Sequence, residues 1–200
     1  ELSARTAEPL DAWDCYRALR RRSPAPFAAF LRFGSLAVCS SSPERFLRVE
    51  ASGLMRAEPI KGTRRRHPDP VHDDALRADL AGSLKDRAEN IMIVDLVRND
   101  LSRVARPGSV SVPELLAVEK HPGLVHLVST VHARLRSGAA WADLLAATFP
   151  PGSVTGAPKH SALRILDGLE PVPRGPYCGA VGWIDTARNT ARLAVGIRTF

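Results

Sequence analysis

Lys61 has the neighbours best suited to chemistry in this sequence. It lies in Pro59-Ile60-Lys61-Gly62-Thr63, where the glycine allows a substrate or another stretch of backbone to approach closely. A lysine in a desolvated pocket can lose its proton and act as a nucleophile. The alternative on this pattern alone is a solvated surface lysine, so Lys61 has to be judged together with the other polar residues.

Glu44 and His126 are the candidates for proton transfer and hydrogen bonding. Glu44 stands in Ser42-Pro43-Glu44-Arg45-Phe46, just ahead of a predicted strand. It can serve as a general acid or base if its surroundings raise its pKa, and the alternative is a surface feature shared with Arg45. His126 stands in an apolar strand, where it can donate a hydrogen bond to a substrate or simply be a satisfied core residue.

Two segments are suited to binding a carboxylate. The loop at 152–159, Gly-Ser-Val-Thr-Gly-Ala-Pro-Lys, precedes a predicted helix, and its free amides can receive an anion. It lacks the glycine spacing and the Gly-Lys-Ser/Thr ending of a phosphate-binding P-loop. Arg198 follows an apolar strand and can form a bidentate contact with a carboxylate.

The segment 85–100 offers carboxylates for a metal ion. Glu89 and Asp100 recur at helical spacing and so lie near one side of a predicted helix. A carboxylate there can hold Mg²⁺, which prefers oxygen ligands and often takes few of them from the protein. The alternative is a charged helix face stabilised by pairs with Lys85 and Arg87.

Short strands and helices must position these residues. Asp11–Arg22, Trp141–Phe149 and Lys159–Leu169 are predicted helices, and 72–101 is either one helix or two joined near Gly82, with an apolar side at Leu76, Leu80, Leu84, Ile91, Val94 and Val97. The predicted strands are 27–33, 36–39, 46–49, 53–56, 110–112, 124–135, 179–184 and 190–197, with 64–70 as a loop. This order predicts an α+β fold of antiparallel β-sheets flanked by helices.

The composition is that of a folded domain. With 44% hydrophobic and 24% charged residues, the chain can bury a core and is not a disordered tail. No apolar run approaches the roughly 20 residues of a membrane span. Three widely spaced cysteines without a Cys-x-x-Cys pair argue against a disulfide framework or a zinc site, so we expect a reducing, cytoplasmic location.

The net charge of +7 raises the alternative of nucleic-acid binding. The basic residues are dispersed, however, apart from the clusters at 20–22 and 64–66, and no aromatic residues accompany these clusters. A solvated surface is the better interpretation, and it is compatible with a basic pocket for an anionic metabolite.

Taken together, the ordered motifs resemble those of the chorismate-utilising enzymes, which include anthranilate, isochorismate, salicylate and aminodeoxychorismate synthases. The resemblance covers nearly the whole chain from Pro24 onward. The matching segments are Ser42–Phe46, Pro59–Thr63, Ala88–Asn90, Arg98–Asp100, His126–Ser129, Thr155–Lys159, Arg174–Gly179 and Ile197–Thr199. Within the family, a lysine at position 61 is similar to aminodeoxychorismate synthase component I, whereas anthranilate and isochorismate synthases usually have alanine there.

The resemblance implies a covalent mechanism. Lys61 would attack carbon two of the chorismate ring and expel the hydroxyl at carbon four, with Glu44 as the general acid. Ammonia would then add at carbon four and release the lysine, giving 4-amino-4-deoxychorismate for p-aminobenzoate and folate synthesis. A glutamine amidotransferase, as a subunit or a fused domain, would supply the ammonia.

The resemblance also implies the binding residues and an incomplete domain. Glu89 would bind Mg²⁺, and the positions expected to hold the substrate are His126, Thr155, Gly156, Tyr177 and Arg198. The family continues after Ile-Arg-Thr with a glycine-rich loop and a second metal-binding glutamate. We therefore expect residues 1–200 to be a chorismate-binding catalytic domain that is incomplete at its N-terminus and lacks the C-terminal segment. The alternatives are an anthranilate or isochorismate synthase, or a non-catalytic fragment.

Overall fold

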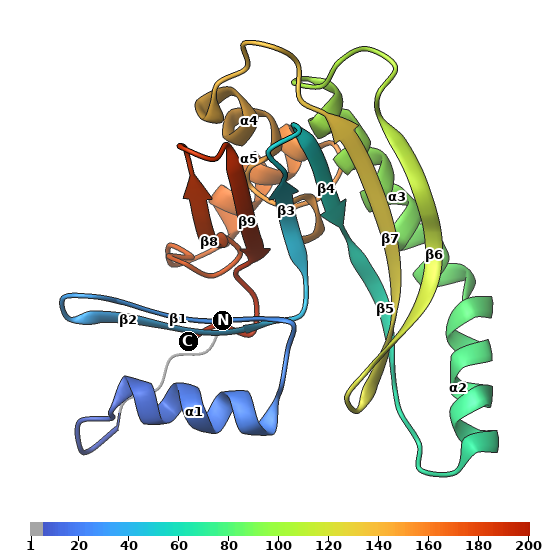
Figure 1. Cartoon of the computed structure of the whole chain (residues 1–200). Helices are drawn as coiled ribbons and strands as arrows, with labels where there is room; N and C mark the ends of the chain where they lie inside the picture. The colour runs from blue at the N-terminus through green and yellow to red at the C-terminus, as the bar shows by residue number, and fades with distance from the viewer. Residues whose placement is uncertain (1–5) are drawn as a thin grey trace.

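Antiparallel strands form the scaffold of the protein, for which the computed structural model describes residues 6–200 (Figure 1). The helices are α1 (Ala12–Arg22), α2 (Pro70–Gly82), α3 (Leu84–Ser102), α4 (Trp141–Thr148) and α5 (Lys159–Leu169), with a short 3₁₀ turn, η1 (Gly152–Val154). The strands are β1 (Phe27–Phe33), β2 (Leu36–Ser42), β3 (Arg45–Val49), β4 (Leu54–Glu58), β5 (Ile60–Arg65), β6 (Ser111–His121), β7 (Leu124–Arg134), β8 (Ala180–Asp185) and β9 (Thr190–Val195).

The main sheet is built around β7. Strands β4 and β5 pair with successive segments of β7, so they lie end to end along one of its sides, and β6 pairs with the other side. Beyond β4 the order continues through β3 and β9 to β8. All of these pairs are antiparallel, which confirms the predicted α+β class.

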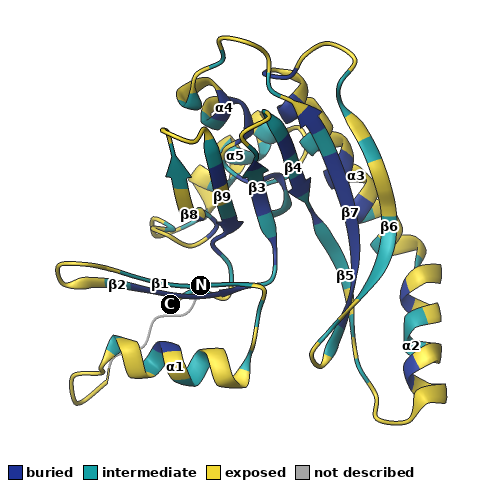
Figure 2. Ribbon diagram, viewed as in Figure 1, coloured by how far each residue is buried: buried dark blue, intermediate teal, exposed yellow. Residues whose placement is uncertain are grey.

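Helix α3 covers one face of this sheet. Alternate side chains of a strand point to the same face, and on β7 the odd-numbered residues from Val125 to Ala133 are fully buried. Val131 and Ala133 pack in one apolar cluster with Val94 and Leu101 of α3. Figure 2 shows β7 and the adjoining parts of β3, β4 and β9 as the buried centre of the fold.

A buried polar network also joins α3 to β7. Asn90 has no exposed surface, and its side-chain amide donates to the carbonyl of Leu127 at 3.0 Å. The hydroxyl of Ser129 donates to the Asn90 oxygen at 2.6 Å and accepts from the amide of Leu116 at 2.9 Å. Because every member has a partner, the network fixes the register of the helix on the sheet at little desolvation cost.

The hairpin of β1 and β2 lies below the main sheet and carries α1 (Figure 1). Trp13 and Tyr16 of α1 pack against Phe30 with ring centroids 5.2 and 5.6 Å away. On β2, Ser40 and Thr199 join their hydroxyls at 2.9 Å, so the segment after β9 is bonded to the hairpin.

Three details differ from the sequence prediction. Arg64 and Arg65 belong to β5 rather than to a loop, because they pair with Val125 and Leu124. Strand β6 runs on to His121, well beyond the predicted 110–112. In the predicted helical segment 72–101, the chain forms two helices, and the second turns Leu84 and Ile91 to solvent, with exposures of 83% and 40%.

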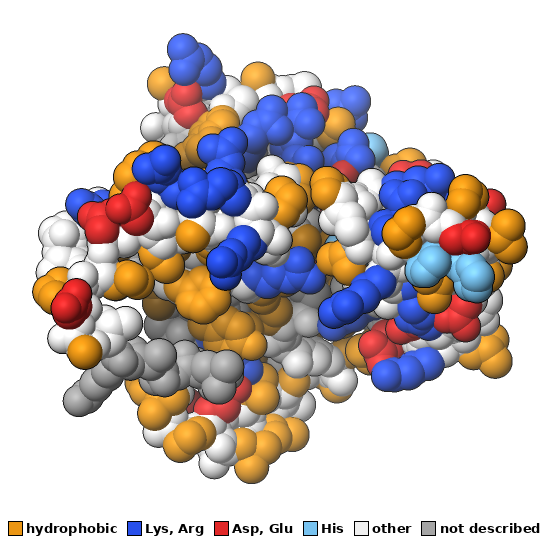
Figure 3. All heavy atoms as spheres, turned by 90° about the horizontal axis from the view of Figure 1, so that it is seen from below, with side chains coloured by type: hydrophobic (Ala, Val, Ile, Leu, Met, Phe, Trp, Pro, Cys, Tyr) orange, Lys and Arg blue, Asp and Glu red, His pale blue; other side chains and the backbone are white. Residues whose placement is uncertain are grey.

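The face seen from below is rich in basic side chains but has no single basic patch (Figure 3). Seen from below, Lys and Arg side chains are spread over several elements and interrupted by acidic and apolar groups (Figure 3). This agrees with the dispersed arginines of the sequence. Among residues 6–200, no helix combines the length and apolar character that crossing a membrane requires.

Candidate active site

Lys61, Glu44 and Ser153 come together from three distant parts of the chain. Glu44 immediately precedes β3, Lys61 lies on β5, and Ser153 lies in η1. The Lys61 amino group donates to the main-chain carbonyl of Ser153 at 3.0 Å. The carboxyl group of Glu44 lies close enough to feel both the charge of Lys61 and the side chain of Ser153. A nucleophile candidate and an acid candidate are therefore neighbours.

A β-bulge positions Lys61. The pairing of β5 with β7 shifts register between Ile60 and Thr63, so Lys61 and Gly62 leave the regular ladder. Gly62 has φ of +91°, and a Cβ on it would lie 2.8 Å from Cβ of Asp86 and 2.9 Å from Cδ1 of Leu80. Only glycine fits at this position of the backbone, which explains why a glycine follows Lys61 in the sequence.

Glu44 is a buried acid and not a surface partner of Arg45. It is 6% exposed, whereas Arg45 pairs with Glu58, Nε to Oε2, at 2.5 Å. Burial raises the pKa of Glu44 to about 7, although Ser153, the charge of Lys61 and the backbone at Ile60 oppose the rise. A carboxyl with this pKa keeps its proton near neutral pH and can deliver it to a leaving group.

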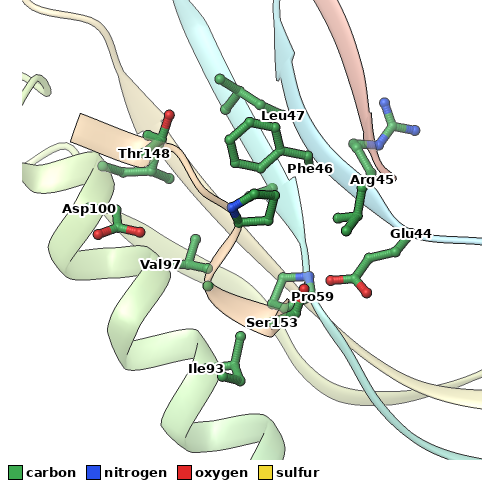
Figure 4. A pocket seen from close by; sticks show the side chains of 15 residues that line it. Glu44, Arg45, Phe46, Leu47, Pro59, Ile93, Val97, Asp100, Thr148 and Ser153 are labelled. Atoms are coloured by element: carbon green, nitrogen blue, oxygen red, sulfur yellow. The ribbon is translucent and has the colours of Figure 1, made fainter. Parts of the chain in front are cut away.

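A small cavity lies behind Glu44, between the sheet and α3 (Figure 4). Glu44 and Ser153 are at one end, and Asp100 and Thr148 are at the other. Its volume of about 20 Å³ holds a water molecule but not a six-membered ring. The cavity is therefore too small to bind a ring-sized substrate, although Glu44 is one of the residues that line it.

His126 forms a second polar group on β7, the strand that pairs with β5. It is 3% exposed on β7, opposite Thr63 in the ladder, and its Nδ1 lies 2.8 Å from the Thr63 hydroxyl. Burial, together with smaller contributions from the charges of His121 and Arg198, lowers the pKa of His126 to about 4. The imidazole is therefore neutral at physiological pH, and the predicted Arg198 lies near enough to influence it.

Thr155 and Gly156 lie in the chain segment 149–158, which joins α4 to α5 and is called here loop 149–158. The Thr155 hydroxyl donates to the carbonyl of Gly152 at 3.1 Å, and Gly156 packs against Ala162 of α5. Both residues are thus in the same loop as Ser153, but Thr155 uses its hydroxyl inside that loop.

Tyr177 lies in a turn next to the end of β9. The amide of Cys178 donates to the carbonyl of Gly196, and Gly196 in turn donates to Gly179, both at 2.8 Å. A Cβ on Gly196 would come within 2.5 Å of the Pro176 carbonyl, so the turn depends on this glycine. Within residues 6–200, the Tyr177 side chain makes no hydrogen bond to Glu44, Lys61 or His126.

Glu89 is a single carboxylate on the surface of α3. Its side chain is 43% exposed and lies 3.7 Å from the Lys85 amino group. In the described part of the chain, no group of three or more His, Cys, Asp or Glu side chains is arranged to hold a metal ion. Mg²⁺ often takes only one or two carboxylates from a protein, so a single glutamate is compatible with it, and the role of Glu89 as a metal ligand stays a prediction.

Sequence patterns did not reveal three further contributors. Ser153 acts through its main-chain carbonyl, which any residue type possesses, and Thr63 became visible only as the ladder partner of His126. Asp100 and Lys159 form a buried ion pair at 2.5 Å, although Asp100 had been considered for a metal site. Both lie within the motifs noted in the sequence, but their partnership depends on the fold bringing the first residue of α5 to α3.

The sequence is similar to proteins of one known family over its whole length. The family described as chorismate binding enzyme matches residues 1–200. An aminodeoxychorismate synthase of Streptomyces griseus is 53% identical over 95% of this chain and 26% of its own length. Aminodeoxychorismate synthase component 1 of Klebsiella aerogenes is 52% identical over 90% of this chain and 40% of its own length.

A solved structure has the same fold. The crystal structure of anthranilate synthase component I from Streptococcus pneumoniae superimposes with a TM-score of 0.84 and 37% sequence identity, covering 94% of this chain and 41% of that one. The chain thus spans less than half the length of each of these relatives.

Proposed function

Since the chain belongs to the chorismate-binding enzymes, we propose that the protein carrying it converts chorismate and ammonia into 4-amino-4-deoxychorismate. The observation that carries this proposal is the Lys61 amino group, placed beside the buried carboxyl of Glu44 and donating to the Ser153 carbonyl at 3.0 Å. The names of the relatives from Streptomyces griseus and Klebsiella aerogenes support the choice of product.

In the first half of the reaction, Lys61 is the nucleophile. Its amine, after giving up a proton to solvent, forms a bond to carbon two of the ring while the carbon–oxygen bond at carbon four breaks and the ring double bonds shift. Glu44 gives its proton to the departing hydroxyl, which leaves as water. The pKa of about 7 supports this role because part of the Glu44 population is protonated at neutral pH.

In the second half, ammonia replaces the lysine. A bond forms between the nitrogen of ammonia and carbon four, the bond between Lys61 and carbon two breaks, and the double bonds return to their first arrangement. Glu44, now a carboxylate, accepts a proton from the added nitrogen. The lysine is released and both residues are ready for another cycle.

Neutral and cationic groups would hold the substrate carboxylates. In the tautomer of His126 that accepts from the Thr63 hydroxyl at Nδ1, the ring hydrogen lies on Nε2, where it can donate to a carboxylate. Arg198, Tyr177, Thr155 and Gly156 complete the proposed binding set. Mg²⁺, with Glu89 as one ligand, would neutralise a carboxylate charge.

We assign the ammonia supply to a glutamine amidotransferase, as a separate subunit or as a fused domain. The name component 1 in the relative from Klebsiella aerogenes is consistent with a second component. The product would feed the synthesis of p-aminobenzoate and folate in the cytoplasm.

The test is product analysis with the protein as its gene encodes it. Incubation with chorismate, Mg²⁺ and ammonium should give 4-amino-4-deoxychorismate, identified by mass spectrometry. Lys61→Ala should abolish it, and Lys120→Ala, at an exposed lysine on β6, is the matched control. Anthranilate or isochorismate as the product would assign a sister activity, and absence of any product would favour a non-catalytic role. Undiminished amination by Lys61→Ala, with ammonia as the only added nucleophile, would contradict the covalent step.

A further inference from the structure

Loop 149–158 is fastened at its base by one lysine. Lys159, the first residue of α5, donates from Nζ to the carbonyl of Thr148, the last residue of α4, at 3.0 Å. The same Nζ lies 2.5 Å from Oδ2 of Asp100 on α3. The two ends of the loop are thus joined to each other and to α3.

The Asp100–Lys159 pair is shielded from solvent. The side chains of Asp100 and Lys159 are 8% and 14% exposed. Burial raises the pKa of Asp100, and the charge of Lys159 opposes this. Withdrawing two charges from water is costly, and an apolar pair of the same volume is often as stable. Fold stability alone is therefore a weak explanation for placing two charges here.

The loop meets α3 at a second point, one helical turn away. A Cβ on Gly152 would lie 2.9 Å from Cδ2 of Leu96, so the backbone of η1 rests directly on α3. Leu96 and Asp100 are four residues apart and lie on the same side of the helix. Ser153 lies in the loop between Gly152, which rests on Leu96, and Lys159, which binds Asp100. Its carbonyl accepts a hydrogen bond from Lys61.

We propose that the Asp100–Lys159 pair is a positioning group for Lys61, because it holds loop 149–158 so that the Ser153 carbonyl meets the Lys61 amino group. This inference rests on the proposed function only for its catalytic consequence. Neither Asp100 nor Lys159 contacts the reacting atoms in this assignment. Their effect reaches Lys61 through the main chain of the loop.

Chemical labelling of Lys61 tests the inference without any turnover. Acetic anhydride at limiting concentration, followed by peptide mass spectrometry, measures how accessible each lysine amine is. Asp100→Asn and Lys159→Met should each raise the labelling of Lys61 several-fold, because the Ser153 carbonyl no longer restrains it. Asp95→Asn is the matched control, since Asp95 forms an exposed pair with Arg98 on the same helix. Unchanged labelling of Lys61 in folded Asp100→Asn and Lys159→Met proteins would overturn the inference.

The double variant Asp100→Leu/Lys159→Met guards against misfolding of the single variants. It leaves no unpaired buried charge, so it should keep the unfolding temperature while losing the bond to the Thr148 carbonyl. Labelling of Lys61 should rise in this protein too. Wild-type labelling in the folded double variant would show that the pair is merely structural and would overturn the inference.

Steady-state kinetics tests whether the Asp100–Lys159 pair also affects the rate of the reaction. A displacement of Lys61 by about 1 Å costs on the order of 100-fold in rate, so kcat should fall by about that factor in the three variants and stay unchanged in Asp95→Asn. Failure of the wild-type protein to aminate chorismate, with the labelling pattern as expected, would refute the proposed function and leave the positioning role standing. Wild-type kcat in the folded variants would overturn the positioning role.

Discussion

Burial of Glu44 has two opposing effects, one on its acid strength and one on the stability of the fold. The buried site suits an acid that must hold its proton near pH 7, but it also makes the charged form of that acid expensive. Lys61 and the Ser153 side chain offset only part of this cost, since the pKa of Glu44 still rises to about 7. Near and above pH 7 this carboxyl therefore lowers the stability of the fold.

This conflict predicts how stability depends on pH. The pKa of Glu44 rises from 4.5 to about 7 on folding, so between these values the folded protein holds a proton that the unfolded chain has released. The free energy of unfolding should therefore fall as pH rises through this window, by on the order of 3 kcal/mol from this group. Glu44→Gln should lack this fall and become the more stable protein at pH 8.

Urea unfolding at pH 4.5 and pH 8 measures the effect. Glu50→Gln is the control, because Glu50 lies in the β3–β4 turn region and its side chain is 39% exposed. It should follow the wild-type pH dependence. If the free energy of unfolding depends on pH in the same way in wild type and Glu44→Gln, the carboxyl of Glu44 does not bind its proton more tightly in the folded state.

At the scale of elements, the β-bulge in strand β5 determines where Lys61 lies. The bulge at Lys61 and Gly62 is possible only because Gly62 has a positive φ and no side chain facing Leu80 and Asp86. These two residues lie on α2 and α3, so the bulge is set by both helices as well as by β7.

Gly62→Ala should therefore destabilise the protein by about 2–4 kcal/mol through backbone strain and the clash with Leu80 and Asp86, and should displace Lys61. Gly82→Ala, at the exposed end of α2 where a Cβ meets nothing within 4 Å, is the matched control and should raise stability by about 0.4–1 kcal/mol. Thermal unfolding and kcat of the two variants decide the matter. Equal stabilities would mean that β5 can relax without the bulge.

The sequence was informative about elements with regular patterns. The apolar run of β7 and the helix from Lys159 to Leu169 were predicted closely, because hydrophobic periodicity and flanking prolines are local signals. Strand β6 was largely missed, since Pro113 and repeated register shifts against β7 hide its alternation. The exposure of Leu84 could not be foreseen either, because the break at Ser83 resets which side of α3 faces the sheet.

The candidate site divides in a similar way. Lys61 and Glu44 were predicted from their motifs, and they do lie together. The Ser153 carbonyl and the Asp100–Lys159 pair were not, because they join segments 92 and 59 residues apart through packing that no local pattern encodes. The roles of Tyr177 and Glu89 remain predictions.

At the scale of the whole molecule, charge is the property most relevant to an anionic substrate. The chain carries a net charge of +7, spread over several elements, and chorismate carries two carboxylates. A positive field raises the rate at which an anion reaches the protein, and salt screens it with a Debye length of about 8 Å at 0.15 M.

The predicted consequence is a dependence of kcat/KM on ionic strength. Raising NaCl from low to high concentration should lower kcat/KM for chorismate several-fold, whereas kcat should change little because Glu44 is buried and salt screens buried charges less. Steady-state assays at fixed Mg²⁺ measure both constants. A kcat/KM that does not respond to salt would show that long-range attraction has no part in substrate capture.

The hydroxyl pair of Ser40 and Thr199 has a consequence for how the protein comes to fold. It closes a loop of 159 positions, and the contact between Lys61 and Ser153 closes one of 92. Contacts so distant in sequence cost chain entropy before they contribute, so hairpins such as β3–β4 can form earlier. The site is therefore assembled by the slowest class of folding contacts. Recovery of activity after refolding should be a stricter measure of completed folding than recovery of helix and strand content.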